Sequence, residues 1–202
     1  MEIVIKHGEY LPHWTSANSI YHVCFRLKDS LPETTIKAWE FERRNIIEAA
    51  KIQGRPLTKE EERQLSNLHS EKVDKYLDTG IGKCWLNNSA VASLVASTLM
   101  YFDGFRYKLY AWCVMPNHVH VLIEVFPQNE LFKIIHSWKS YSASRVNKIL
   151  NRMGSFWHHD AYNRIIRSEK EFRYQMNYVW SNPDMAGLKN WKYRYMIRPE
   201  MV

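Results

Sequence analysis

Two histidines separated by a single residue are the most distinctive chemical feature of the sequence. His118 and His120 lie in the largely apolar segment AWCVMPNHVHVLIE, which is typical of a strand inside a sheet. Side chains alternate between the faces of a strand, so we expect both imidazoles on one face and Val119 and Val121 on the other. Two imidazoles so placed can bind one metal ion through their ring nitrogens. A pair of surface histidines on a half-exposed strand is the alternative for so short a pattern.

Hydrophobic periodicity predicts the elements that position this pair. The predicted order is strand, helix, strand, strand, helix, strand, helix, which is the ferredoxin-like order. We therefore predict an α+β fold, a ferredoxin-like antiparallel sheet with helices mainly on one face. The strands are expected at 19–27, 105–115, 118–126 and, less regularly, within 155–166; the helices at 88–103, 130–150 and 168–182, the last ending at Asn182-Pro183.

Residues 33–83 differ sharply in composition from the segments around them. Apolar residues at helical spacing predict a helix over 35–50, and Gly54-Arg55-Pro56 ends it. Thr58 and Glu61 have the spacing of a capping box, which predicts a second helix continuing past Tyr76. We interpret this region as a charged helical hairpin inserted into a single domain of residues 1–202. It shows no residues with evident chemistry.

The composition favours a globular protein and argues against membrane-spanning, secreted and disulfide-rich classes of protein. The chain has 202 residues, of which 46% are hydrophobic and 14% aromatic, enough for a packed core. No apolar run approaches the roughly 18–20 residues of a membrane span, and the first residues do not have the pattern of a signal peptide. The 3 cysteines suggest neither a disulfide framework nor a cysteine-based zinc site. We expect a cytoplasmic protein with no membrane partner.

The net charge of +7 comes entirely from the C-terminal third. Residues 1–129 hold 15 basic and 15 acidic side chains, whereas residues 130–202 hold 13 basic and 6 acidic ones. A basic region with interleaved aromatic residues is typical of a protein that binds a polyanion. A solvated basic face is the alternative interpretation.

The segment YAWCVMPNHVHVLIE resembles the signature strand pair of the HUH single-tyrosine transposases, and most closely that of the REP-associated tyrosine transposases. The resemblance covers nearly the whole chain and includes the order of the motifs. It continues through LPHWTSANSIYHVCFRLKDSLP (11–32), KSYSASRVNKIL (139–150), FWHHDAYNRIIRSEKEF (156–172) and YVWSNPDMAGL (178–188).

The resemblance implies a metal-dependent catalytic site. Its nucleophile is the tyrosine after the FW pair, here Tyr162, and its metal ligands are His118 and His120, with Mg²⁺ or Mn²⁺ as the ion. Relatives take a third ligand from a polar side chain one helical turn after the tyrosine, but Ile166 stands at that position. The remaining candidates for the third ligand are Asn163, His158 and Asp160. Tyr174 and Tyr178 are assigned to the last helix.

The resemblance also implies the substrate. The expected activity is cleavage and strand transfer of single-stranded DNA at a palindromic, REP-like hairpin through a 5′-phosphotyrosine, by a monomer or a homodimer. A domesticated, non-catalytic hairpin-binding protein is one alternative, and a metal phosphodiesterase that uses activated water is another. The expected DNA contacts, each also compatible with an ordinary surface role, are Lys139, Arg145, Lys148, Trp157, Arg164 and Arg167.

Overall fold

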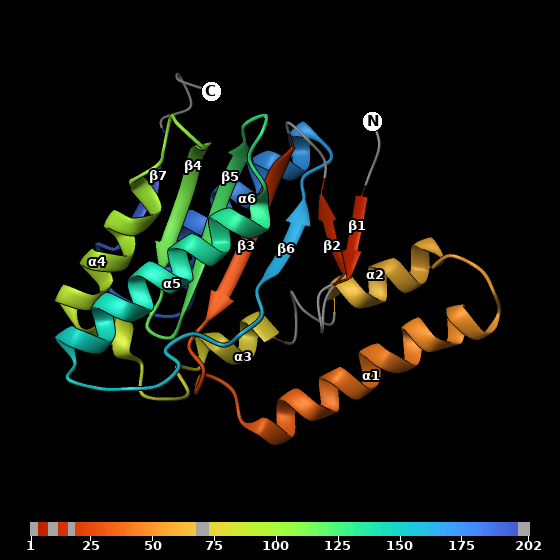
Figure 1. Ribbon diagram of the computed structural model, residues 1–202, viewed down its shortest axis with the longest axis horizontal. Coiled ribbons are helices and arrows are strands. Elements are labelled where there is room, and N and C mark those ends of the chain that lie inside the picture. Colours follow the sequence, from red (N-terminus) through yellow and green to blue (C-terminus); the bar gives the residue numbers. More distant parts are fainter. Residues whose placement is uncertain (1–3, 8–11, 16–18, 68–72, 198–202) are drawn as a thin grey trace.

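The computed structural model describes residues 4–7, 12–15, 19–67 and 73–197, and its centre is a five-stranded antiparallel sheet (Figure 1). The strand order is β6-β3-β5-β4-β7. When β3, β4, β5 and β6 are numbered 1 to 4 along the chain, they lie in the sheet in the order 4-1-3-2. This is the ferredoxin-like arrangement. The predicted fold class is therefore confirmed. The strands are β3 (Ile20–Arg26), β4 (Tyr107–Val114), β5 (His118–Val125), β6 (Tyr162–Ile165) and the short edge strand β7 (Arg194–Met196).

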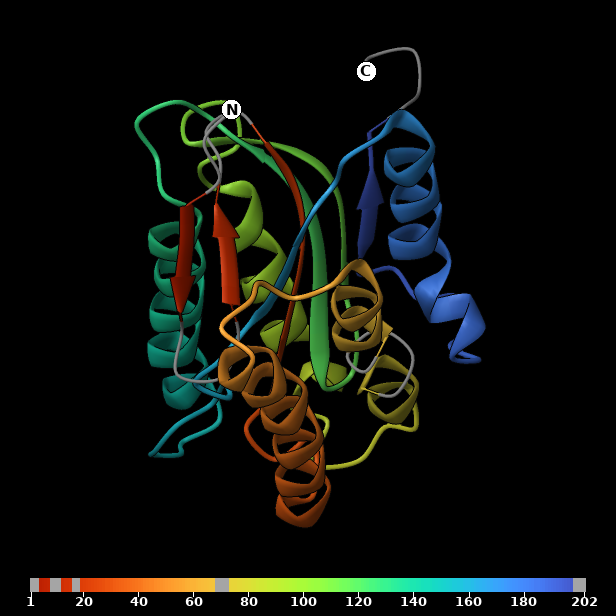
Figure 2. The same cartoon turned by 90° about the vertical axis from the view of Figure 1, so that its right-hand side faces the viewer.

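Helices cover both faces of the sheet. Helices α4 (Ser89–Met100) and α5 (Leu131–Ile149) lie on one face, and α6 (Glu169–Met185) lies on the other, as the two perpendicular views show (Figures 1 and 2). The expectation of helices mainly on one face describes α4 and α5 and misses α6.

Local sequence explains where these helices begin and end. The Asn88 side chain accepts hydrogen bonds from the first turn of α4, and the Ser168 side chain accepts one from the backbone N–H of Glu171 at the start of α6. The predicted end of α6 at Asn182-Pro183 is wrong, because the helix continues to Met185. Pro183 stands in the last turn, where its missing N–H removes a single helical hydrogen bond, and the N–H of Ala186 donates to the carbonyl of Asn182 at 3.0 Å.

The main hydrophobic core lies between the sheet and the pair α4 and α5. Val119, Val121 and Ile123 of β5 project into it and are fully buried. Trp138 of α5 is also buried there, and its indole N–H donates to the hydroxyl of Tyr107 at 3.0 Å. Alternate residues of β5 thus form the apolar surface of the sheet that contacts this core, as the predicted alternation requires.

All the regular secondary structure described in the region 33–83 is helical. Helices α1 (Glu33–Ile52) and α2 (Lys59–Asn67) form a hairpin that projects from the sheet (Figure 1), and the short α3 (Asp74–Asp78) follows. The Thr58–Glu61 capping box is confirmed, since the Thr58 hydroxyl and the Glu61 carboxylate each accept the other residue's backbone N–H. The predicted second helix corresponds to α2 and α3, and residues 68–72 between them lie outside the described residues.

Four small elements were not predicted, and the edge strand β7 is one of them. Strands β1 (Val4–His7) and β2 (Pro12–Thr15) pair as an antiparallel two-stranded sheet, and the 3₁₀ helix η2 (Trp85–Asn87) precedes α4. Among the described residues, no helix combines the length and the apolar character needed to cross a bilayer.

Candidate active site

His118 and His120 lie on the central strand β5 and are completely buried. Their ring centroids are 4.8 Å apart, so both side chains share one face of the sheet, as predicted. Cys24 of β3 and Cys113 of β4 are the register partners of His120 and flank it on the two neighbouring strands. The residues of this face pack against α6 and α3 on the side opposite the main core.

Asn117 fixes the orientation of the His118 ring. The Asn117 Nδ2 donates to the carbonyls of Leu77 and Ile81, both at 3.0 Å, so its Oδ1 is an acceptor. His118 Nδ1 lies 2.7 Å from that oxygen and therefore carries the proton. The lone pair of His118 is then on Nε2, which faces the Asp78 Oδ1 of α3 at 3.7 Å. Burial lowers the pKa of His118 to about 3, so the imidazole is neutral and able to bind a metal.

His120 contacts a third buried histidine. Its Nδ1 lies 3.1 Å from the Nε2 of His22, and the two rings stack with centroids 5.2 Å apart. Burial, with a smaller contribution from the positive charge of Arg164, lowers the pKa of His22 to about 4. A neutral His22 can therefore orient His120 by a hydrogen bond between the rings. The ligand atoms of Cys24, Asp74 and His120 lie within 4.8 Å of one another.

Helix α3 brings two carboxylates close to the histidines. Asp74 and Asp78 are four residues apart on one side of the helix, and Asp74 is almost fully buried. Burial raises the pKa of Asp74 to about 7 and that of Asp78 to about 6. The sequence of the inserted region shows no residues with evident chemistry, and it is pairing across the fold, not a local motif, that brings these two carboxylates close to the histidines.

Tyr178 of α6 also contacts this group of buried residues. Its ring packs edge-on against His120, with centroids 5.4 Å apart, and its hydroxyl donates to Asp74 Oδ2 at 3.0 Å. Asn182 follows one helical turn later and is completely buried, and neither of its amide atoms has a hydrogen-bond partner among the described residues. Sequence reasoning missed both residues. The signal that could have found them is the Tyr-x₃-Asn spacing on the last helix, a tyrosine with a polar side chain one turn beyond it.

Tyr162 begins β6 and lies in the same row of the sheet as His120. It pairs with Cys24, which pairs in turn with His120, so one strand separates the tyrosine from the histidine. Neighbouring strands are about 4.8 Å apart, which puts the two backbones about 10 Å apart. The Tyr162 side chain is partly buried against the small cluster that contains Cys24 and Leu77. Because Tyr162 is in a strand, no helical turn follows it.

The three other candidates for a third ligand lie elsewhere. Asn163 pairs with Val23, whose side chain belongs to the α4 and α5 core, so Asn163 points to the opposite face from His120. His158 and Asp160 line a pocket beside α5 together with Asn163. The structure therefore does not bring these three residues to the histidine pair.

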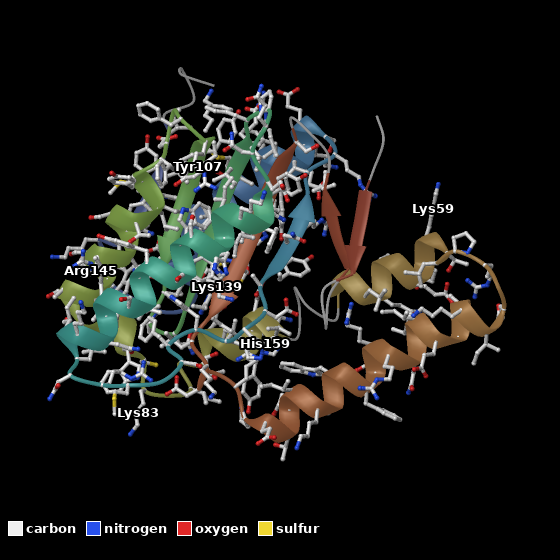
Figure 3. The ribbon with its side chains drawn as sticks, viewed as in Figure 1. Lys59, Lys83, Tyr107, Lys139, Arg145 and His159 are labelled. Carbon is white, nitrogen blue, oxygen red and sulfur yellow. The ribbon has the colours of Figure 1, made fainter. Side chains whose placement is uncertain are left out.

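The predicted DNA contacts divide between the two faces. The Lys139 ammonium donates to the carbonyls of His159 and Asp160 (Figure 3), and Trp157 is buried with its indole N–H donating to Ser142. The stacking of a base on Trp157 is thus incompatible with this packing. Arg145 and Lys148 are exposed on α5, whereas Arg164, in register with His22, and the nearby Arg167 are exposed on the β6 side.

A solved structure shares this fold. A structure of a REP-associated tyrosine transposase bound to a REP hairpin is 11% identical, with 90% of this chain and 76% of that chain covered and a TM-score of 0.50. A candidate transposase from Deinococcus radiodurans R1 is 15% identical, with 86% of this chain and 95% of that chain covered and a TM-score of 0.33. A search of curated proteins found no match. Residues 85–182, which contain both histidines, Tyr162 and Tyr178, match the family described as IS200-like transposases. Through this segment, which is just under half of the chain, the protein is similar to the IS200-like transposases.

Proposed function

We propose that this protein cleaves and rejoins single-stranded DNA beside a hairpin, using a divalent metal ion and a covalent phosphotyrosine. The observation that carries the proposal is the buried pair His118 and His120 with a tyrosine hydroxyl beside it. Two imidazoles and nearby oxygen ligands suit Mn²⁺ or Mg²⁺. Such an ion supplies charge that polarises the scissile phosphate and stabilises the transition state.

Two tyrosines are candidates for the nucleophile, and the geometry favours Tyr178 over Tyr162. Tyr178 contacts His120 directly, whereas Tyr162 lies across an intervening strand. Tyr178 is also in a helix and has Asn182 one turn later, which fits the position of the third ligand in related transposases. The amide oxygen of Asn182 is buried without a partner among the described residues. A metal ion bound there would satisfy this oxygen.

The contacts of Tyr178 supply a path for its proton. Burial, and then the negative charge of Asp74, raise the pKa of Tyr178, so the hydroxyl is protonated at neutral pH and needs an acceptor. Asp74 already accepts the hydrogen bond. In the proposed step the proton passes to Asp74, the phenolate oxygen bonds to phosphorus, and the bond between phosphorus and the 3′ oxygen breaks. The departing 3′ oxygen takes up a proton from solvent, and Asp74 releases its proton to solvent. The products are a 5′-phosphotyrosine and a 3′-hydroxyl, and the reverse reaction joins strands without ATP.

The proposed substrate is a DNA hairpin with a single-stranded flank. The supporting observations are the family match and the hairpin bound to the structurally similar transposase. Arg164 and Arg167 lie on the β6 side and are suited to contact phosphates near the scissile bond. Arg145 and Lys148, on α5, are suited to contact a more distant part of the DNA.

The decisive experiment is a covalent-adduct assay with the purified protein, Mn²⁺ and a labelled hairpin oligonucleotide. We expect an adduct that Tyr178→Phe abolishes, with cleavage reduced at least about a thousand-fold. Mass spectrometry of the conjugated peptide identifies the residue, and Tyr162→Phe is the matched control. An adduct on Tyr162 would move the nucleophile to β6. Cleavage without any adduct would support the water-activating phosphodiesterase, and tight binding without cleavage the non-catalytic hairpin-binding protein.

A further inference from the structure

Asp78, in the inserted region, faces His118 without making a hydrogen bond to it. The Asp78 Oδ1 and the His118 Nε2 are 3.7 Å apart, too far for a hydrogen bond. Both atoms are buried, and neither has a hydrogen-bond partner among the described residues. Buried polar atoms without partners are rare and costly in folded proteins, so this pair requires an explanation.

Both facing atoms are electron-pair donors. The proton of His118 is on Nδ1, where Asn117 accepts it, and this leaves a bare lone pair on Nε2. A carboxylate oxygen likewise presents lone pairs. Two such atoms repel each other when they are buried unless a positive charge lies between them. A cation with bonds of about 2.1 Å would hold two ligand atoms between about 3.0 and 4.2 Å apart, and 3.7 Å lies within that range.

The neighbouring carboxylate is already engaged. Asp74 Oδ2 accepts the hydrogen bond of Tyr178, and its Oδ1 lies 4.0 Å from the thiol sulfur of Cys24 as the acceptor of that group. Asp78 therefore presents the free carboxylate oxygen of α3. This oxygen is directed at His118, the histidine whose metal-binding nitrogen is the more clearly defined.

We propose that Asp78 is a carboxylate ligand of the divalent cation bound by His118 and His120. The inserted region 33–83 is then a part of the metal centre, and the carboxylate balances part of the cation's charge. This inference rests on the proposed metal-dependent function and extends it to a residue outside the family-matched segment 85–182.

The test is Mn²⁺ binding by the full chain without DNA, measured by electron paramagnetic resonance of free Mn²⁺ and by the metal-induced shift in melting temperature. We expect Asp78→Asn to weaken Mn²⁺ binding at least ten-fold and to remove most of that shift. His118→Ala should weaken binding similarly. Glu60→Gln is the matched control, because Glu60 is an exposed carboxylate of the same region that pairs with Arg63, and it should bind Mn²⁺ like the wild type.

Folding of the variant is checked without metal. An asparagine at position 78 can donate an N–H to the His118 lone pair, so Asp78→Asn should melt no lower than the wild type in EDTA. Unchanged Mn²⁺ binding in Asp78→Asn, with binding lost in His118→Ala, would overturn the role of Asp78 and leave the histidine site intact. Loss in Cys24→Ser but not in Asp78→Asn would place the ion at the neighbouring cluster and overturn it too. Unchanged binding in both Asp78→Asn and His118→Ala would instead remove the metal site of the proposed function.

Discussion

The two faces of the central sheet use alternate residues of the same strands for different purposes. Toward α4 and α5, β5 directs valine and isoleucine side chains into an apolar core. Toward α3 and α6, the same strand directs two fully buried histidines that meet carboxylates and a tyrosine. Burying polar groups costs free energy unless partners compensate for it. The face toward α4 and α5 therefore stabilises the fold. The face toward α3 and α6 lowers the stability of the fold, because it buries polar groups that it holds in a fixed position.

The largest effect on stability should come from the core face. Trp138→Ala removes a fully buried ring and its hydrogen bond to Tyr107, so we expect the free energy of unfolding to fall by about 3–5 kcal/mol. Chemical denaturation measures this change. DNA cleavage per folded molecule should stay near the wild-type level, and a specific loss of cleavage would show that the two faces are not separable.

The pH dependence of stability should distinguish the polar face. The pKa of Asp74 is raised in the folded protein from its ordinary value of 3.8 to about 7. The folded state therefore binds this proton more tightly, and the stability it contributes is present at low pH and lost as the pH rises from about 4 to about 7. In EDTA, the unfolding free energy of the wild type minus that of Asp74→Asn should decrease over this range. A difference that stays constant with pH would contradict the buried position of the carboxyl.

His120→Ala should lower metal affinity and DNA cleavage more than stability, which is the reverse of the effect expected for Trp138→Ala. Removing an imidazole ligand should lower Mn²⁺ affinity at least about ten-fold, because even residues that only support a ligand contribute 10–100-fold. Cleavage should fall with it, while the loss of stability stays below that of Trp138→Ala. Calorimetric Mn²⁺ titration and denaturation of the same samples give both numbers, and unaltered metal affinity would exclude His120 as a ligand.

The smallest effect concerns charge at the surface. Arg164 lies on the polar face, so Arg164→Ala should weaken hairpin binding by about 1 kcal/mol and reduce the salt slope of binding by about 1. Arg145→Ala, on α5, is the matched control and should change both less. Fluorescence anisotropy at several salt concentrations measures the slopes. A larger effect for Arg145 would place the DNA across α5.

Alternation and helical periodicity predict the sheet, its main helices and the orientation of the histidine pair, because these features depend on neighbouring residues. The same reasoning predicts the end of α6 too early, because a proline in the last turn of a helix costs less than one in its interior.

The rest of the site depends on contacts between distant segments. Nothing in the local sequence says that Asp74 and Asp78 face β5, because α3 is only five residues long. Periodicity alone likewise gives the helix of Tyr178 but not the face of the sheet on which it packs. A motif selects Tyr162, and the strand expected within 155–166 contains it, but only the fold shows that another strand separates it from His120.

The Asn117 amide links the turn after β4 to the backbone carbonyls of Leu77 and Ile81. Trimming residues 33–83 to obtain a minimal enzyme would take both acceptors away. The amide could then rotate, and the adjacent imidazole would lose the anchor that sets its tautomer. The ionisation of the His118 imidazole in the shortened protein should therefore be measured by NMR before a loss of turnover is attributed to poor folding.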